Sequence, residues 1–166
     1  MRHIILILLF ISCSDNHKQK ANDFYEKGIS KFESGDYKGA IIKLNKAIEI
    51  DSKHIYSYNL RGLSKYELKD LKGAIADYDK AIKLKPEDAN SYNYRGNSKH
   101  SLNDYKEAIK DYNKAIQIDP QYAMAYFNRG LSKYYLKEFN SACRDFSNAE
   151  KLGSDIAYDA KKDLCN

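Results

Sequence analysis

Histidine and cysteine, the side chains that most often bind metal ions or attack substrates, are few in this sequence and far apart. The four histidines are His3, His17, His54 and His100. No Cys-x-x-Cys or His-x-x-x-His spacing occurs, and each glycine is solitary, which excludes a glycine-rich phosphate loop. The acidic residues recur at a fixed interval, which favours structure over a paired general acid and base. We therefore expect no catalytic residue, no metal site, no bound cofactor and no enzyme activity.

One pair of opposite charges recurs through the chain. An arginine is followed sixteen residues later by an aspartate three times, as Arg61 with Asp77, Arg95 with Asp111, and Arg129 with Asp145. The equivalent positions nearer the N-terminus hold Lys27 and Lys43. Exposed ion pairs contribute only about 0–1 kcal/mol to stability, and partly buried pairs contribute more. We interpret the three pairs as structural clasps, with a ligand role as the alternative.

The elements that position these pairs repeat every 34 residues. Small residues keep this interval in three series without an insertion: Gly28, Gly62, Gly96 and Gly130; Ala40, Ala74, Ala108 and Ala142; Ala47, Ala81, Ala115 and Ala149. A period of this length indicates stacked supersecondary units, each of which needs its neighbours to bury its apolar face. The glycines and alanines mark the places where two helix backbones must approach closely.

The repeated pattern resembles the tetratricopeptide repeat. The second unit matches it at Tyr58, Gly62, Ala74, Tyr78, Ala81 and Pro86, and the third at Tyr92, Gly96, Ala108, Tyr112, Ala115 and Pro120. The first unit departs modestly at Phe24, Leu44 and Ser52, and the fourth ends in Gly153-Ser154 in place of a proline. The resemblance implies an all-α fold, a right-handed helix-turn-helix solenoid that binds other proteins without catalysis.

The repeat divides residues 21–153 into four units, at 21–54, 55–88, 89–122 and 123–153. The pattern predicts helix pairs at 21–34 and 38–50, 55–68 and 72–85, 89–102 and 106–118, and 123–136 and 140–152. Residues 154–166 follow the last unit and begin with a plausible N-cap, Ser154-Asp155. We expect a solvating cap helix there, and a degenerate fifth repeat is the alternative description.

The N-terminus resembles a bacterial lipoprotein signal. Residues 1–12 join a basic start to an apolar run from Ile4 to Ile11, which is too short to cross a bilayer, for which about 20 residues are needed. Cys13 follows, at the place where a lipobox cysteine is acylated. Residues 13–20 would then be the lipidated cysteine and a polar tether without secondary structure. Ordinary secretory cleavage, a disordered start, or a cytosolic protein with an uncleaved N-terminus are the alternatives.

Export would place the remaining two cysteines in an oxidising compartment. Cys143 lies early in the last predicted repeat helix, and Cys165 ends the predicted cap. With Cys13 acylated, these two thiols could form a disulfide that holds the cap. Two buried free thiols are the alternative.

The family resemblance assigns ligand binding to a concave face lined by the first helix of each unit. Its residues here are Tyr56, Asn59, Tyr66, Asn90, Asn93, Asn97, His100, Phe127, Tyr134 and Tyr135. Aromatic rings provide contact area, and asparagine amides can bond a peptide backbone. We expect an extended peptide or partner protein in this groove, although several rings could instead fill gaps between units.

The net charge of +5 is spread through the sequence, with acids and bases interleaved at helical spacing. Nucleic-acid binding would need the bases gathered in one stripe, so we expect none. The expected function is a non-catalytic scaffold or adaptor, anchored by lipid to a membrane of the bacterial cell envelope. A carbohydrate-binding or enzyme-accessory lipoprotein, with sugars stacked on the tyrosines, is the alternative.

Overall fold

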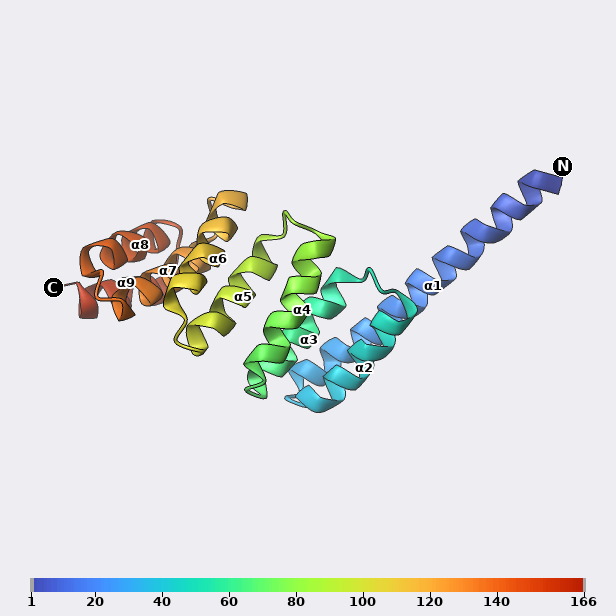
Figure 1. Cartoon of the computed structure of the whole chain (residues 1–166), viewed down its shortest axis with the longest axis horizontal. Coiled ribbons are helices and arrows are strands. Elements are labelled where there is room, and N and C mark those ends of the chain that lie inside the picture. The colour runs from blue at the N-terminus through green and yellow to red at the C-terminus, as the bar shows by residue number, and fades with distance from the viewer. Residues whose placement is uncertain (1, 166) are drawn as a thin grey trace. The chain divides into compact units, whose positions relative to one another are not determined.

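A computed structural model describes the backbone of residues 2–165 and the side chains of residues 16–165. Every regular element in that range is an α-helix, and the chain divides into two compact units. The first unit ends at Leu84 and contains α1 (Arg2–Glu33), α2 (Tyr37–Ile50), α3 (Ile55–Glu67) and α4 (Leu71–Leu84). The second contains α5 (Ala89–Ser101), α6 (Tyr105–Ile118), α7 (Ala123–Tyr135), α8 (Phe139–Lys151) and α9 (Asp155–Leu164) (Figure 1).

Each unit is built from helical hairpins that pack on one another. In the first unit α1 packs against α2, α3 packs against α4, and α2 also lies against α3. In the second unit α5 packs against α6 and α7 against α8, α6 lies against α7, and α9 packs on α8. The predicted all-α fold of stacked hairpins with a closing helix is confirmed. From α2 to α8, every helix begins and ends within one residue of its expected position.

The hairpins close around small residues of the periodic series. All eight alanines of the two alanine series have no exposed surface. The second helix of each hairpin then places one large side chain in the interior, and the four of these are Leu44, Tyr78, Tyr112 and Phe146. Each packs directly against the periodic glycine of the first helix. A side chain at that glycine would occupy the same space. The 34-residue period therefore reflects a packing requirement: each large side chain of a second helix needs a glycine opposite it.

Gly130 shows this requirement most strictly. A Cβ atom at this position would lie 2.6 Å from Cε1 of the buried Phe146 ring and 3.2 Å from the backbone oxygen of Ala142. Replacing glycine by alanine within an exposed helix usually stabilises the protein by about 1 kcal/mol. Because overpacking a core costs about 1–3 kcal/mol, we expect Gly130→Ala to destabilise the protein instead. Urea unfolding checks the sign, and an unchanged or raised midpoint would contradict this packing.

The turns between paired helices have a common backbone conformation. Lys69, Asn103 and Lys137 have φ values of 65°, 63° and 64°, and Gly35 has the equivalent place with 76°. An acid follows each of these residues and directly precedes the second helix. The carboxylates of Asp36 and Asp70 accept hydrogen bonds from the amides of Gly39 and Gly73 at 2.9 and 3.0 Å. These two caps satisfy amides that the helix itself leaves unbonded, whereas Asp104 and Glu138 make no such bond.

The first helix extends further toward the N-terminus than expected. Residues 14–20, for which we predicted no secondary structure, belong to α1, and the side chains of residues 16–20 are exposed. A helix that is already nucleated adds residues at little cost, so α1 continues beyond the part that packs on α2. The side chains of the predicted signal segment and of Cys13 lie outside the described residues. Among those described, no helix combines the length and hydropathy of a membrane span.

Candidate functional site

Three buried carboxylates join the two helices of their hairpins. Asp77, Asp111 and Asp145 are 3%, 4% and 3% exposed. Each accepts two hydrogen bonds from the arginine on the facing helix. In the α5–α6 hairpin, Arg95 donates from Nε to Oδ2 of Asp111 at 2.9 Å and from Nη2 to Oδ1 at 2.6 Å. Arg61 and Arg129 bind Asp77 and Asp145 in the same way. The sixteen-residue spacing therefore corresponds to a bidentate contact inside each hairpin.

A lysine that the sequence analysis overlooked completes each clasp. The Nζ atoms of Lys65, Lys99 and Lys133 lie 2.7, 2.8 and 2.8 Å from the same three aspartates. These lysines also recur every 34 residues, and that interval could have identified them. Two of the arginines also bond to an asparagine outside their own hairpin. Nη1 of Arg61 donates to Asn45 at 2.6 Å and Nη1 of Arg129 to Asn113 at 2.7 Å, which connects α3 to α2 and α7 to α6. Both carboxylate oxygens of each aspartate therefore have partners within its own hairpin.

Two residues predicted to face the groove are buried instead. Asn59 is 9% exposed and Asn93 only 1%. The side-chain oxygen of Asn93 accepts a hydrogen bond from Asn128 at 3.2 Å, and its amide also interacts with the hydroxyl of Tyr122. Asn93 faces the next hairpin of its unit, so stacking covers it. The expectation that these two amides bind a peptide was wrong.

Other predicted groove residues also have partners within the second unit. Tyr112 donates its hydroxyl to Asn97 at 2.8 Å, and Tyr122 donates to the exposed Asn90 at 2.8 Å. The ring of Phe127 packs on Phe146 at 5.9 Å between centroids. Asn97 and Phe127 thus contact the second helix of their own hairpin, and Asn90 contacts the next hairpin, so the Phe127 ring does not fill a gap between units as the alternative interpretation expected.

An aromatic cluster remains accessible at one end of α5 and α7. It consists of His100, Tyr105, Tyr134, Tyr135 and Phe139, three of which were predicted for the groove. The Tyr105 and Tyr135 rings are stacked, with centroids 5.0 Å apart and planes at 8°, and His100 meets both rings edge-on. Tyr134 contacts Phe139 at 5.2 Å. Tyr135 is 58% exposed and Phe139 48%, so the cluster presents apolar area to solvent.

A polar hollow adjoins the cluster at the start of α8. It has a volume of about 380 Å³ and shares Phe139 with the aromatic cluster. The rest of its lining is Lys137, Glu138, Asn140, Ser141 and Arg144. Because two of these residues are cations, Lys137 and Arg144, and one is a carboxylate, Glu138, the wall has a net positive charge. The second unit therefore combines exposed rings with a neighbouring basic recess, which suits a segment that carries both an apolar and an acidic group.

Of the predicted groove residues in the first unit, Tyr56 belongs to a smaller aromatic group with Tyr25 and His54. Tyr56 is 61% exposed, and its ring lies 6.2 Å from Tyr25 and 6.0 Å from His54. His54 is fixed by two contacts, from Nδ1 to Ser57 Oγ at 2.7 Å and from Nε2 to Asn22 Oδ1 at 2.9 Å. Tyr66 is half-buried, with the amine of Lys69 5.7 Å from its ring centroid. The structure places Tyr56 and Tyr66 in separate contacts rather than in one cluster.

Comparison with known proteins identifies the repeated hairpins. The family model for the TPR repeat matches residues 62–102 and 96–137. Residues 62–137 therefore contain tetratricopeptide repeats. Among curated proteins, none matches this sequence.

Several solved structures share the TPR fold of this chain. The first TPR of Spaghetti (RPAP3), bound to the HSP90 peptide SRMEEVD, is 27% identical with a TM-score of 0.70, over 72% of this chain and 95% of that one. The pilF structure from Pseudomonas aeruginosa is 21% identical with a TM-score of 0.83, over 90% of this chain and 69% of that one. A MamA structure is 24% identical with a TM-score of 0.75, over 80% and 77%. The last two likenesses show the fold alone.

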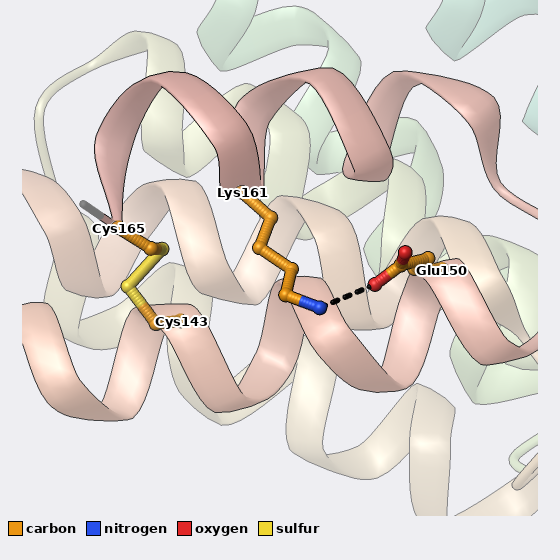
Figure 2. The surroundings of a disulfide bond; sticks show 4 residues. All are labelled: Cys143, Glu150, Lys161 and Cys165. Atoms are coloured by element: carbon orange, nitrogen blue, oxygen red, sulfur yellow. Dashed lines mark hydrogen bonds and ion pairs between the residues drawn. A yellow bond between two sulfur atoms is a disulfide. The ribbon is translucent and has the colours of Figure 1, made fainter.

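The TPR hairpins end at α9, which is bonded covalently to α8. A disulfide joins Cys143 to Cys165, with their Cα atoms 5.8 Å apart (Figure 2). The Nζ atom of Lys161 on α9 also lies 2.7 Å from Oε2 of Glu150 on α8. Ala157 is the residue of α9 that is buried. The bridge therefore holds a helix that has little apolar contact of its own.

We expect His100 to make the fold sensitive to acid. Its Nδ1 lies 2.8 Å from Ser132 Oγ, and burial lowers the pKa of the imidazole because the charged form loses solvation. The unfolded chain then binds more protons than the folded chain between the folded pKa and about 6.5. We expect stability that is complete above about pH 6.5 to decrease as the pH falls below it.

Urea unfolding near neutral pH and in mild acid checks this expectation. His54 contributes in the same direction, since burial also lowers its pKa against a smaller opposite effect of Asp51. His100→Gln should reduce the loss of stability in acid, whereas His17→Gln, at an exposed position, should leave it unchanged. An equal loss in wild type and His100→Gln would contradict this role.

Proposed function

We propose that this TPR protein is a non-catalytic scaffold or adaptor that binds an extended segment of a partner protein. The aromatic cluster of the second unit carries this proposal, because it presents aromatic rings to solvent where α5 and α7 end and α6 and α8 begin. Exposed aromatic rings supply binding area at a low cost in conformational entropy. The structure of the first TPR of Spaghetti with its bound peptide supports the same mode of action.

The side chains around the cluster suggest the chemistry of the partner segment. The rings of Tyr135 and Phe139 would contact an apolar or aromatic side chain. The hollow beside them, with Lys137 and Arg144 in its wall, would accept a carboxylate. A segment with an acidic residue next to an apolar one fits both features. Affinity in the micromolar range, roughly −8 kcal/mol, is what we expect of such a surface.

A library of displayed peptides, presented to the full-length protein, tests this proposal. We expect enrichment of sequences with adjacent apolar and acidic residues. Tyr135→Ala should weaken their binding by tenfold or more, because it removes the exposed ring from the cluster. Tyr158→Ala is a matched control, since Tyr158 is 56% exposed in the same unit but lies on α9. Equal binding by both variants would exclude the cluster as the site.

A glycan array run in parallel separates the carbohydrate alternative. Stacked tyrosines can also bind the apolar face of a sugar ring. Sugar binding that requires Tyr135, without any peptide enrichment, would favour the carbohydrate-binding or enzyme-accessory lipoprotein.

We further propose that the protein is attached to a membrane of the bacterial cell envelope through acylated Cys13. The apolar run Ile4–Ile11 that ends shortly before this cysteine supports the proposal. Mass spectrometry of the mature protein should find diacylglycerol on an N-terminal Cys13, and Cys13→Ser should leave the chain unacylated. An unmodified Cys13, or a mature N-terminus elsewhere, would remove the anchor.

A further inference from the structure

The fold separates charges that are interleaved in the sequence. The second helices of the first unit, α2 and α4, carry six lysines: Lys38, Lys43, Lys46, Lys72, Lys80 and Lys83. Their carboxylates are Glu49, Asp77 and Asp79, and Asp77 is turned inward to Arg61 and Lys65. Six lysines against the two outward carboxylates leave a net charge of +4. The clasp thus removes one acid from the surface and leaves the lysines outside.

Five of these lysines are exposed, and we call Lys38, Lys46, Lys72, Lys80 and Lys83 the basic face. Lys38 and Lys72 are equivalent positions of the repeat, as are Lys46 and Lys80. Hairpin stacking brings equivalent positions to the same side of a unit. Among the described residues of this unit, Lys31 pairs with Asp36 and two cations bind Asp77, and none of these ion pairs involves a lysine of the basic face. The ammonium group of Lys46 lies 5.6 Å from the centroid of the Phe24 ring, which leaves its charge uncompensated. The charges of the basic face can therefore attract an anionic surface.

We propose that the basic face docks on an anionic phospholipid membrane. The proposal is independent of the peptide-binding site, which lies in the second unit. Exposed lysines near anionic headgroups attract them additively, and no shaped pocket is needed. Ile42, 57% exposed, lies one helical turn from both Lys38 and Lys46, so an apolar side chain sits among the cations where it can enter the headgroup region.

The composition of the face favours lipid over nucleic acid. All five cations are lysines, whereas bidentate recognition of phosphates and bases relies on arginine. Neither α2 nor α4 exposes an aromatic ring in the described structure, so bases would find no stacking partner. A compact ammonium on a flexible stem is sufficient for a diffuse layer of headgroups. Nucleic acid and acidic proteins are therefore the competing outcomes of the test.

Vesicle co-sedimentation of the full-length chain carrying Cys13→Ser tests the proposal without an acyl anchor. The vesicles are phosphatidylcholine alone, or phosphatidylcholine with phosphatidylglycerol. The apolar N-terminus can insert into both kinds of vesicle equally, so a preference for vesicles with phosphatidylglycerol would measure the electrostatic contribution to binding. We expect stronger binding to the anionic vesicles, and loss of that preference at high salt, because exposed charges are screened over about 8 Å at physiological ionic strength.

Two charge variants of the first unit locate the contact. Lys72→Gln/Lys80→Gln/Lys83→Gln removes three lysines of the basic face, and Lys18→Gln/Lys53→Gln/Lys69→Gln removes three exposed lysines that lie outside α2 and α4 in the same unit. Each lysine near the membrane contributes about fivefold to binding. We therefore expect the first variant to lose at least tenfold on anionic vesicles, and the second to lose less than the first. Both should retain wild-type peptide binding.

Several results would overturn the proposal. Equal binding to both kinds of vesicle, or equal losses in the two variants, would show that the basic face makes no specific contact. Tighter binding at the same salt to a single-stranded oligonucleotide or to polyglutamate than to anionic vesicles would assign the face to a different partner. Since these assays do not involve Tyr135, their failure would leave the peptide-binding proposal untouched.

Discussion

Asp111→Ala should lower the free energy of unfolding by about 3–5 kcal/mol, the range found when one partner of a buried ion pair is removed. The side chain of Asp111 is 5% exposed, and it binds both Arg95 and Lys99, which are 19% and 18% exposed. Without the carboxylate, two cations would remain together in a largely desolvated site. Their mutual repulsion and lost solvation are the physical reason for the large effect. Chemical denaturation of the full-length protein measures it.

Asp119→Ala is a matched control, because Asp119 is exposed beyond the end of α6 and outside the clasp. It should change stability by less than about 1 kcal/mol. A double-mutant cycle with Arg95→Met and Asp111→Leu measures the coupling energy between the two side chains. Replacing both by apolar residues of similar volume should cost little stability. Additive effects of the two substitutions, or a small effect of Asp111→Ala, would show that the clasp is incidental.

Removal of the disulfide with Cys143→Ser/Cys165→Ser should lower the free energy of unfolding by about 3 kcal/mol. The bridge closes a loop with a sequence separation of 22 residues, and a crosslink of this length restricts the unfolded chain by about that amount. Beyond the bridge, α9 is held by the Lys161–Glu150 contact and by the burial of Ala157 (Figure 2). Hydrogen exchange should therefore show that α9 loses protection before α7 and α8 do.

A reductant provides the control for this experiment. Dithiothreitol should destabilise the wild-type protein to the level of the double-serine variant and should leave the variant itself unchanged. Unaltered protection of α9 after reduction would show that packing alone holds the closing helix. A stability loss spread equally over every helix would argue against a local role of the bridge.

The accessible part of the candidate site is smaller than the sequence suggested, and the reason lies in the stacking of hairpins. The family resemblance placed Asn93 and Tyr135 on one concave surface. Asn93 is 1% exposed, since Asn128 and Tyr122 of the next hairpin cover it, whereas Tyr135 is 58% exposed at the end of its helix. Both positions belong to first helices with the same period. The sequence pattern does not distinguish them, because exposure depends on how far the neighbouring hairpin extends.

The sequence by itself determined the features that depend on local geometry. The 34-residue interval predicted helix positions from α2 to α8 within one residue, since helix length and turn position follow from periodicity and capping. The spacing of Arg95 and Asp111 predicted a contact, because two helices joined by one fixed turn place those positions opposite each other. Gly130 was assigned to close packing for the same reason.

Tertiary structure decided which side of each helix remains in contact with water. α2 and α4 carry six lysines and three acids, and burial of Asp77 beneath Arg61 and Lys65 makes their outer surface more basic still. The same packing recruited Lys99 as a third member of the clasp and covered Asn93. Each outcome depends on contacts between hairpins or across a hairpin interior. Such contacts arise from residues far apart in the chain, and a linear pattern of residue types does not specify which of two similar polar side chains they will enclose.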